Sequence, residues 1–275
     1  MALAAALLAA AAIAAPTPAQ LLARHVPVLE LAPAEPYLPS TVEPFLALTQ
    51  DRGAYLDVTD CDPAAGPEAT DCYRPLSDGP VTYGRALTTP TRIVLSYWLF
   101  YPYNPWSVRT PAGDVVWRSH EGDWEVVLVV LDRRGSPLQV GYSQHCRGER
   151  RAWRSAPRRG SRPLVRVALG SHANYPGRGR HVHDPRCWPD AANVVFRAVR
   201  TEPVDVAGGG AVVRPRLVRL APAPPWLSYG GAWGETGWFH AGEADIAYGL
   251  GPKGPAFQAE WRTPLRELAR WPLRR

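Results

Sequence analysis

Proline and glycine recur throughout this chain, and their spacing limits what it can fold into. The 275 residues include 30 prolines and 24 glycines. Proline removes a backbone hydrogen-bond donor and glycine weakens helix interiors. Their frequent occurrence therefore disfavours long helices and favours short strands joined by turns. Hydrophobic residues make up 46% of the chain, enough for a large core. We therefore predict an all-β fold, an antiparallel β-sandwich with long loops and a few short helices.

Two runs of β-branched and aromatic residues are the clearest strand signals. Residues 92–101 and 123–131 both read as buried strands. The second run ends at a turn over residues 132–135, and a third strand over 138–145 is expected to complete a hairpin with it. Further strands are expected at 164–169, 193–199, 203–206 and 212–220, and short helices at 17–24, 40–49 and 264–270.

The N-terminus is an Ala-rich apolar run of the length of a signal peptide. It is too short to span a membrane as a helix, and small residues follow it. We expect residues 1–19 to be a signal peptide and residues 20–275 to form a single domain; the alternative is an ordinary Ala-rich helix. No later stretch has the length and apolarity of a transmembrane helix. The expected location is secreted or periplasmic.

Four cysteines permit three disulfide pairings. We favour Cys61–Cys72, which closes a short polar loop, and Cys146–Cys187, because disulfides suit an exported protein. Free thiols and a Cys/His zinc site are the alternatives, although no close C-x-x-C pair is present.

The formal charge of +6 is carried almost entirely by arginine, since Lys253 is the only lysine. Eight arginines fall between Arg147 and Arg166. They indicate either a solvated loop or attraction to an anionic surface such as phospholipid or acidic glycan. No nucleic-acid motif accompanies the charge, so nucleic acid is not an expected partner.

The segment around residues 120–125 contains the pattern His120-x-x-Asp123-x-Glu125. In an extended strand, Asp123 and Glu125 share one face, and the apolar residues that follow on that face belong to a core. Two carboxylates there cannot both ionise cheaply, so a divalent cation (Ca²⁺, Mg²⁺ or Mn²⁺) held with His120 is one solution. Pairing with arginines is the other. Asp114, in an upstream turn, is a candidate for one more oxygen ligand.

Other residues near this motif are candidates for proton transfer. His145 ends the third strand and is expected to come opposite the carboxylates, and His172 follows a short apolar strand. A histidine near its ordinary pKa serves as an acid or a base, and Glu121 is a further acid. We interpret His181 and His183, in a loop rich in Gly and Arg, as surface residues.

Several motifs in order resemble the vacuolar-protein-sorting 62-like family. They lie at residues 33–42, 96–104, 120–125, 142–145, 170–175, 231–234 and 251–255. Residues 119–125 also resemble the heptad Gly-His-Arg-His-Asp-Trp-Glu of the necrosis- and ethylene-inducing-peptide-like proteins, secreted β-sandwich cytolysins. That resemblance implies a cation held by His120, Asp123 and Glu125. Gly122 replaces the second His of the heptad, and Ser119 replaces its leading Gly.

Three functions follow as hypotheses. The first is a secreted binding protein whose cation engages glycan or anionic lipid head groups. Its expected ligand contacts are Trp106, Tyr142 and Tyr175, and the loop residues Trp153 and Trp188 are further candidates for apolar contact. The second is a metal-assisted hydrolase of glycan or phosphoester bonds, with His145 or His172 moving the proton. The third is a purely structural cation site.

Overall fold

The computed structural model describes residues 15–188, 190–242 and 244–274. Most of the expected signal peptide lies outside these ranges. In the described part of the chain, no helix is long and apolar enough to cross a membrane.

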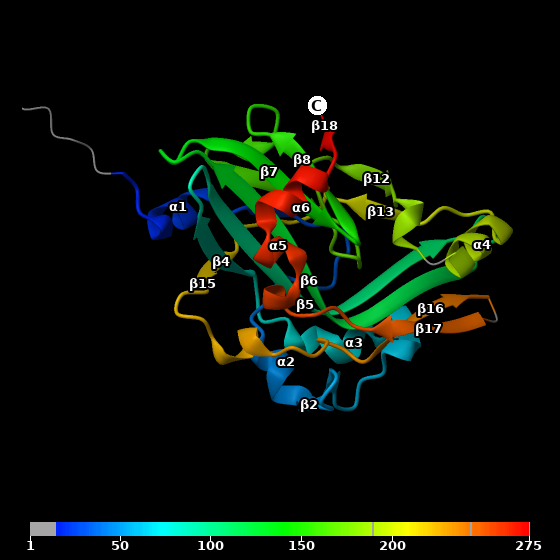
Figure 1. Ribbon diagram of the computed structural model, residues 1–275. Helices are drawn as coiled ribbons and strands as arrows, with labels where there is room; N and C mark the ends of the chain where they lie inside the picture. Colours follow the sequence, from blue (N-terminus) through cyan, green and yellow to red (C-terminus); the bar gives the residue numbers. More distant parts are fainter. Residues whose placement is uncertain (1–14, 189, 243, 275) are drawn as a thin grey trace, which may run out of the picture.

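The chain is mainly β-structure with short helices (Figure 1). The strands are β1 (Val28–Glu30), β2 (Thr49–Asp51), β3 (Leu56–Val58), β4 (Val81–Thr88), β5 (Ile93–Arg109), β6 (Val115–Leu131), β7 (Pro137–Gln144), β8 (Arg147–Ala152), β9 (Arg158–Arg159), β10 (Arg162–Val167), β11 (Asn174–Tyr175), β12 (Gly179–Val182), β13 (Val204–Ala207), β14 (Val212–Val213), β15 (Arg216–Arg219), β16 (Thr236–Ala241), β17 (Ala244–Leu250) and β18 (Leu273–Arg274). The α-helices are α1 (Pro18–His25), α2 (Glu43–Leu48), α3 (Thr70–Tyr73), α4 (Asp190–Ala198), α5 (Ala259–Arg262) and α6 (Pro264–Arg270).

The larger sheet is built on the long strands β5 and β6, which cross the whole molecule in Figure 1. Its strands follow the order β15-β4-β5-β6-β7-β8-β18, and the hairpin β16–β17 joins the first half of β6. A smaller sheet has the order β11-β10-β1-β14. Among the described strands, three pairings are parallel: β1 with β10, β15 with β4, and β18 with β8. The sheets are therefore mixed rather than purely antiparallel, and the sandwich arrangement stays a prediction.

The core lies on both faces of the larger sheet. Residues 93–106 of β5 and 121–131 of β6 are buried without alternation. That pattern is typical of strands covered on both sides. The main core includes Leu29 and Val165 from the smaller sheet, as well as Leu268 of α6 and the adjacent Trp271. Helices α5 and α6 lie over part of this sheet in Figure 1.

The sequence predicted the central strands and three of the helices. The three strands around the 132–135 turn form as expected, and β6 and β7 pair as an antiparallel hairpin. The helices expected at 17–24, 40–49 and 264–270 correspond to α1, α2 and α6. The expected strand at 212–220 is divided into β14 and β15, and Pro215 lies between them.

The strand predicted at residues 193–199 is wrong, because this segment is part of helix α4. Ala192 and Phe196, four residues apart, face a secondary core, whereas Val194 is 56% exposed. Apolar residues four apart share one helix face, so the helical period prevails over the β-branched composition.

Candidate functional site

Strand β6 places Asp123 and Glu125 at the edge of the core. They pair with Tyr101 and Leu99 of β5, and both line a cavity of about 320 Å³ beside β6. Each residue is 6% exposed. Both carboxylates therefore border the same cavity, as does the intervening Trp124.

Gly122 changes the direction of the side chains that precede this pair. It has φ of 56°, a left-handed conformation in the middle of a strand. A Cβ at this position would lie 1.9 Å from the carbonyl oxygen of Trp233, so only glycine fits. The left-handed residue interrupts the alternation of side-chain direction along β6. His120 therefore lines the cavity beside Asp123, whereas Glu121 does not. A histidine at position 122, as in the cytolysin heptad, has no room here.

The Nε2 atom of His120 lies 3.9 Å from Oδ1 of Asp123. The other oxygen of Asp123, Oδ2, accepts hydrogen bonds from Asn104 Nδ2 at 3.2 Å and from His172 Nδ1 at 2.9 Å. Asn104 and His172 thus fix the carboxylate and leave Oδ1 directed toward His120.

His172 lies behind Asp123 rather than in the cavity. Its side chain is fully buried, its Nε2 is 3.3 Å from Oε1 of Glu35, and its ring stacks on Tyr101 at 3.9 Å. Burial alone would lower the pKa of His172, but Glu35 and Asp123 raise it to about 9. The resulting imidazolium holds the pKa of Asp123 below its usual value, against the effect of burial. The geometry makes His172 a positioning residue for Asp123.

Glu125 is held from the neighbouring strand. Its Oε2 accepts a hydrogen bond from the hydroxyl of Ser143, which in turn accepts from Val126 N and from Asn174 Nδ2. Burial, followed by the charge of Asp123, raises the pKa of Glu125 well above its usual value. A cation beside both carboxylates would offset that repulsion.

The rest of the cavity combines aromatic walls with two cationic side chains. Indole rings come from Trp106, Trp124 and Trp188, and the cations are Arg118 and Lys253. Trp106 and Trp188 pack on each other with ring centroids 5.2 Å apart. The full lining is Asn104, Trp106, Arg118, His120, Asp123, Trp124, Glu125, His145, Cys146, Ser171, Cys187, Trp188, Leu250, Gly251, Pro252, Lys253 and Gln258.

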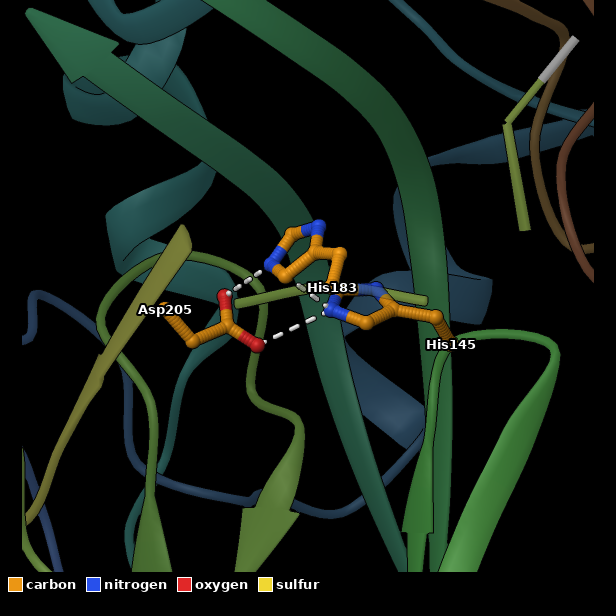
Figure 2. A group of neighbouring side chains, drawn as sticks. All are labelled: His145, His183 and Asp205. Carbon is orange, nitrogen blue, oxygen red and sulfur yellow. Dashed lines mark hydrogen bonds and ion pairs between the residues drawn. The ribbon is translucent and has the colours of Figure 1, made fainter. Parts of the chain in front are cut away.

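A second polar cluster adjoins this cavity and consists of His145, His183 and Asp205 (Figure 2). The Nε2 atom of His145 is 2.9 Å from Asp205 Oδ2, the Nε2 of His183 is 3.1 Å from Asp205 Oδ1, and the two Nε2 atoms are 3.1 Å apart. Among the described residues, this is the group of three whose donor atoms all lie within 4.8 Å of one another. His120, Asp123 and Glu125 are not gathered this closely.

Sequence reasoning missed two members of this cluster. His183 is buried, with 4% exposure, so its interpretation as a surface residue is wrong. It follows β12 and lies against Trp106 and Trp188. No role for Asp205 was predicted from the sequence. A carboxylate between Val204 and Val206 in a short strand is nevertheless a recognisable sign of a buried acid. Strand pairing of β12 with β13 brings the two segments together.

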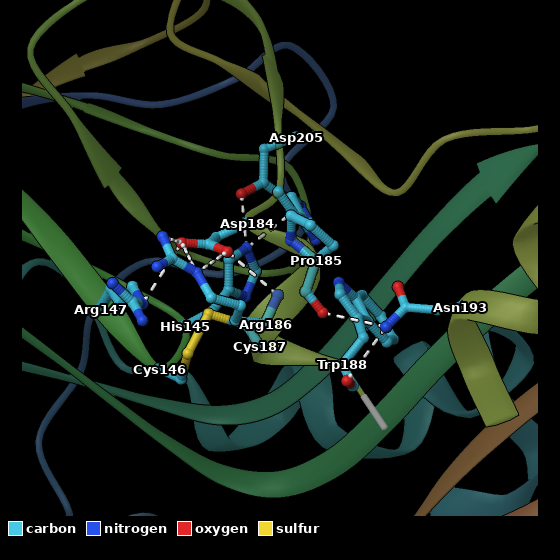
Figure 3. The surroundings of a disulfide bond; sticks show 11 residues. His145, Cys146, Arg147, Asp184, Pro185, Arg186, Cys187, Trp188, Asn193 and Asp205 are labelled. Carbon is cyan, nitrogen blue, oxygen red and sulfur yellow. Dashed lines mark hydrogen bonds and ion pairs between the residues drawn. A yellow bond between two sulfur atoms is a disulfide. The ribbon is translucent and has the colours of Figure 1, made fainter. Parts of the chain in front are cut away.

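The disulfide Cys146–Cys187 joins the segments that carry His145 and His183 (Figure 3). Asp184 reinforces the connection, because its carboxylate pairs with Arg147 of the other segment at 3.3 Å. The second disulfide is Cys61–Cys72, so both favoured pairings are confirmed.

Other candidate residues lie away from the cavity. Glu121 is fully buried and accepts a hydrogen bond from Tyr73 at 2.8 Å; burial raises its pKa to about 8. Tyr142 is fully buried, and the hydroxyl of Tyr175 donates to Asp205 at 2.7 Å. Asp114 lies in a turn beside a different surface hollow.

Of the expected aromatic contacts, Trp106 and Trp188 line the cavity. Trp153 instead packs edge-on against His25. His181 is partly exposed and stacks on Tyr175.

No protein-family model matches the chain. It is similar to vacuolar protein sorting-associated protein 62 of Saccharomyces cerevisiae, with 26% identity over 64% of this chain and 43% of the yeast protein. A putative vacuolar protein sorting-associated protein, TDA6, from the same yeast is 27% identical over 59% of this chain and 41% of its own length. The chain thus spans less than half the length of these curated relatives.

Solved structures similar to this one belong to the necrosis- and ethylene-inducing-type proteins. One is described as a toxin fold for microbial attack and plant defense; it is 14% identical, has a TM-score of 0.48, and the match covers 93% of this chain and 92% of that one. Another is NLPPya in complex with glucosamine, 15% identical with a TM-score of 0.44 over 92% of both chains. The two resemblances drawn from the sequence motifs thus recur in these comparisons.

Proposed function

We propose that this protein is a divalent-cation-binding protein that engages a glycan in the cavity beside β6. A cation held by His120, Asp123 and Glu125 would bind hydroxyl or carboxylate oxygens of the sugar. The two disulfides fit an oxidising compartment outside the cytoplasm, where a binding protein would encounter extracellular glycans.

The observation that carries the proposal is the spacing of His120 Nε2 and Asp123 Oδ1. Their separation of 3.9 Å is too long for a hydrogen bond. Cation bonds of about 2.1–2.4 Å place two donor atoms roughly 3–5 Å apart, depending on the angle between the bonds, so one ion would bridge this gap. Glu125 lines the same cavity and would supply a further oxygen after a shift of its side chain. The donor types and the His120–Asp123 spacing therefore suit a divalent cation.

The walls of the cavity favour a sugar as the bound group. A volume of about 320 Å³ is at the small end of ligand pockets, the size of one or two sugar rings. Trp106 and Trp188, 3% and 7% exposed, line the cavity and would add apolar contact to a sugar, and Arg118 and Lys253 would attract an acidic substituent. A lipid head group is the alternative ligand, and the binding experiment distinguishes the two.

The hydrolase hypothesis has less support from the geometry. The side chain of His172 is fully buried and does not line the cavity, so it does not reach a substrate there. His145 does line the cavity, but its Nε2 atom is directed toward Asp205. We retain binding without turnover as the proposed function.

The test begins with thermal unfolding of the wild type and of Asp123→Asn and Glu125→Gln in Ca²⁺, Mg²⁺, Mn²⁺ or chelator. We expect the cation to raise the Tm of the wild type and to have a much smaller effect on both variants. Asp114→Asn, a carboxylate at a different hollow, serves as the matched control and should respond like the wild type. Equal responses in all four proteins would refute the cation site.

Calorimetry with acidic and neutral oligosaccharides, and with vesicles of phosphatidylserine and phosphatidylcholine, then identifies the ligand. Cation-dependent saturable binding of a sugar without product formation supports the proposal. Binding to vesicles alone, or release of a hydrolysis product, contradicts it.

A further inference from the structure

We infer that His145, His183 and Asp205 form a second metal site, for zinc or a similar borderline transition metal, with one coordination position open to the cavity. This site shares no ligand with the cation site of the proposed function. It therefore stands or falls independently of it.

The three contacts of the cluster cannot all be hydrogen bonds. If both Nε2 atoms carry protons, each donates to its own oxygen of Asp205, and the two N–H groups then face each other across 3.1 Å. If one Nε2 is unprotonated, it accepts from the other ring but presents a lone pair to a carboxylate oxygen. Protons thus satisfy two of the three contacts, whereas a cation between the two rings and the carboxylate would accept lone pairs from both nitrogens and from Asp205.

The spacing of the donor atoms agrees with a tetrahedral ion. Metal–ligand bonds of about 2.0–2.1 Å at tetrahedral angles separate the donors by roughly 3.3 Å. The two nitrogens are 3.1 Å apart, and they lie 2.9 and 3.1 Å from different oxygens of Asp205. One ion would bind both nitrogens together with one or both of these oxygens after small shifts of the side chains.

The donor set selects the class of metal. Two imidazole nitrogens and one carboxylate oxygen suit zinc and its neighbours, whereas Ca²⁺ and Mg²⁺ prefer sites made of oxygen. Three protein ligands with a fourth position left open are the arrangement found when zinc also binds water or a ligand atom. His145 and Ser171 line the cavity, so the open position would face the sugar-binding space.

The surroundings hold the donors in place. Asp205 is 1% exposed, and it accepts hydrogen bonds from Ser171 to Oδ1 at 2.7 Å and from Tyr175 to Oδ2 at 2.7 Å. Such outer hydrogen bonds orient metal-binding carboxylates. His145 has φ of 49°, which is uncommon outside glycine. The disulfide Cys146–Cys187 joins the segments that carry both histidines (Figure 3).

The test measures metal binding directly, with Zn²⁺ and Co²⁺ as probes. After dialysis against Zn²⁺, we expect one equivalent of zinc on the wild type by mass spectrometry, and a visible Co²⁺ band of tetrahedral intensity. His145→Ala and His183→Gln should each weaken Zn²⁺ binding at least 100-fold and abolish the band. His145 lies at the cavity wall, so its variant is informative even if the buried His183 variant fails to fold.

Two further variants sharpen the result. His181→Ala removes a neighbouring histidine outside the cluster and should keep full zinc binding. Tyr175→Phe removes one outer hydrogen bond from Asp205 and should weaken Zn²⁺ binding roughly 10- to 100-fold.

Asp123→Asn and Glu125→Gln separate this inference from the proposed function. If they lose the Ca²⁺ or Mg²⁺ response but keep zinc, the two sites are distinct, as inferred. The second site is refuted if zinc stoichiometry is unchanged in His145→Ala, if His181→Ala loses as much zinc as the cluster variants, or if zinc binding follows Asp123 and Glu125 instead.

Discussion

Gly122→Ala is the substitution whose effect the structure specifies most closely. The left-handed φ of 56° costs an alanine roughly 1–2 kcal/mol. The new Cβ would lie 1.9 Å from the carbonyl oxygen of Trp233, a backbone atom that cannot rotate away. Overpacking of this kind costs about 1–3 kcal/mol, so we expect a total loss of roughly 2–5 kcal/mol in the free energy of unfolding.

Gly160→Ala is the matched control for this substitution. Gly160 has φ of 62°, close to that of Gly122, but a Cβ there would meet no atom within 4 Å. Gly160→Ala should therefore lower the free energy of unfolding only through the unfavourable backbone conformation, by about 1–2 kcal/mol. Urea unfolding of the two variants separates conformation from contact. In thermal scans the loss at Gly122 corresponds to roughly 5–20 °C in Tm for a chain of this size.

The same substitution should also affect the cation site. The conformation of Gly122 is what places His120 beside Asp123, so a shift of this residue would move the imidazole away from the carboxylate. We expect the cation-induced rise in Tm to shrink in Gly122→Ala and to persist in Gly160→Ala. Equal stability losses in the two variants, together with an unchanged cation response, would refute the reasoning about the Trp233 contact.

Two further predictions concern buried carboxylates outside the cavity. Tyr73→Phe removes the hydroxyl that donates to the fully buried Glu121, and urea unfolding should show a loss of about 1–3 kcal/mol; an unchanged midpoint would mean that water replaces this bond. Burial would raise the pKa of Glu30, but hydrogen bonds from Arg178 and Gly209 lower it below its ordinary value. The ionised Glu30 therefore stabilises the fold above its unfolded pKa, and this stabilisation is lost as the pH falls below about 4.5. Glu30→Gln should therefore be less stable than the wild type at pH 7 by urea unfolding, and the difference should narrow at pH 3 to 4; a constant difference would contradict the ionic explanation.

Local pattern predicted the strands that form the centre of the molecule. The runs that became β5, β6 and β7 are long and rich in β-branched and aromatic residues, and a turn connects the last two. Pairings between distant segments left no local signal. Strand β1 lies parallel to β10, and their residues 28–30 and 164–166 are far apart in sequence. Such long-range contacts depend on how the whole core closes, which is why the mixed character of the sheets was not foreseen.

The candidate site was predictable where its residues share one strand. Asp123 and Glu125 lie two residues apart on β6, so alternation alone places them together. His120 comes to the same side for a different reason, the left-handed Gly122, which alternation does not include. The second cluster needed tertiary information, because His145, His183 and Asp205 come from three separate segments.

The charges around the cavity give both metal proposals a common physical basis. Four carboxylates, of Glu35, Asp123, Glu125 and Asp205, lie among buried imidazoles, and the charge of Asp205 reaches Glu125. His172 carries one positive charge, since its pKa is raised to about 9, but it is shared between Glu35 and Asp123. Burial lowers the pKa values of His120 and His183, so these rings add little positive charge near neutral pH. Buried carboxylates in excess of their protonated partners raise the free energy of the fold unless a proton or a metal ion joins them. Two cations of different chemical class, one held mainly by carboxylate oxygens and one mainly by imidazole nitrogens, would supply that charge.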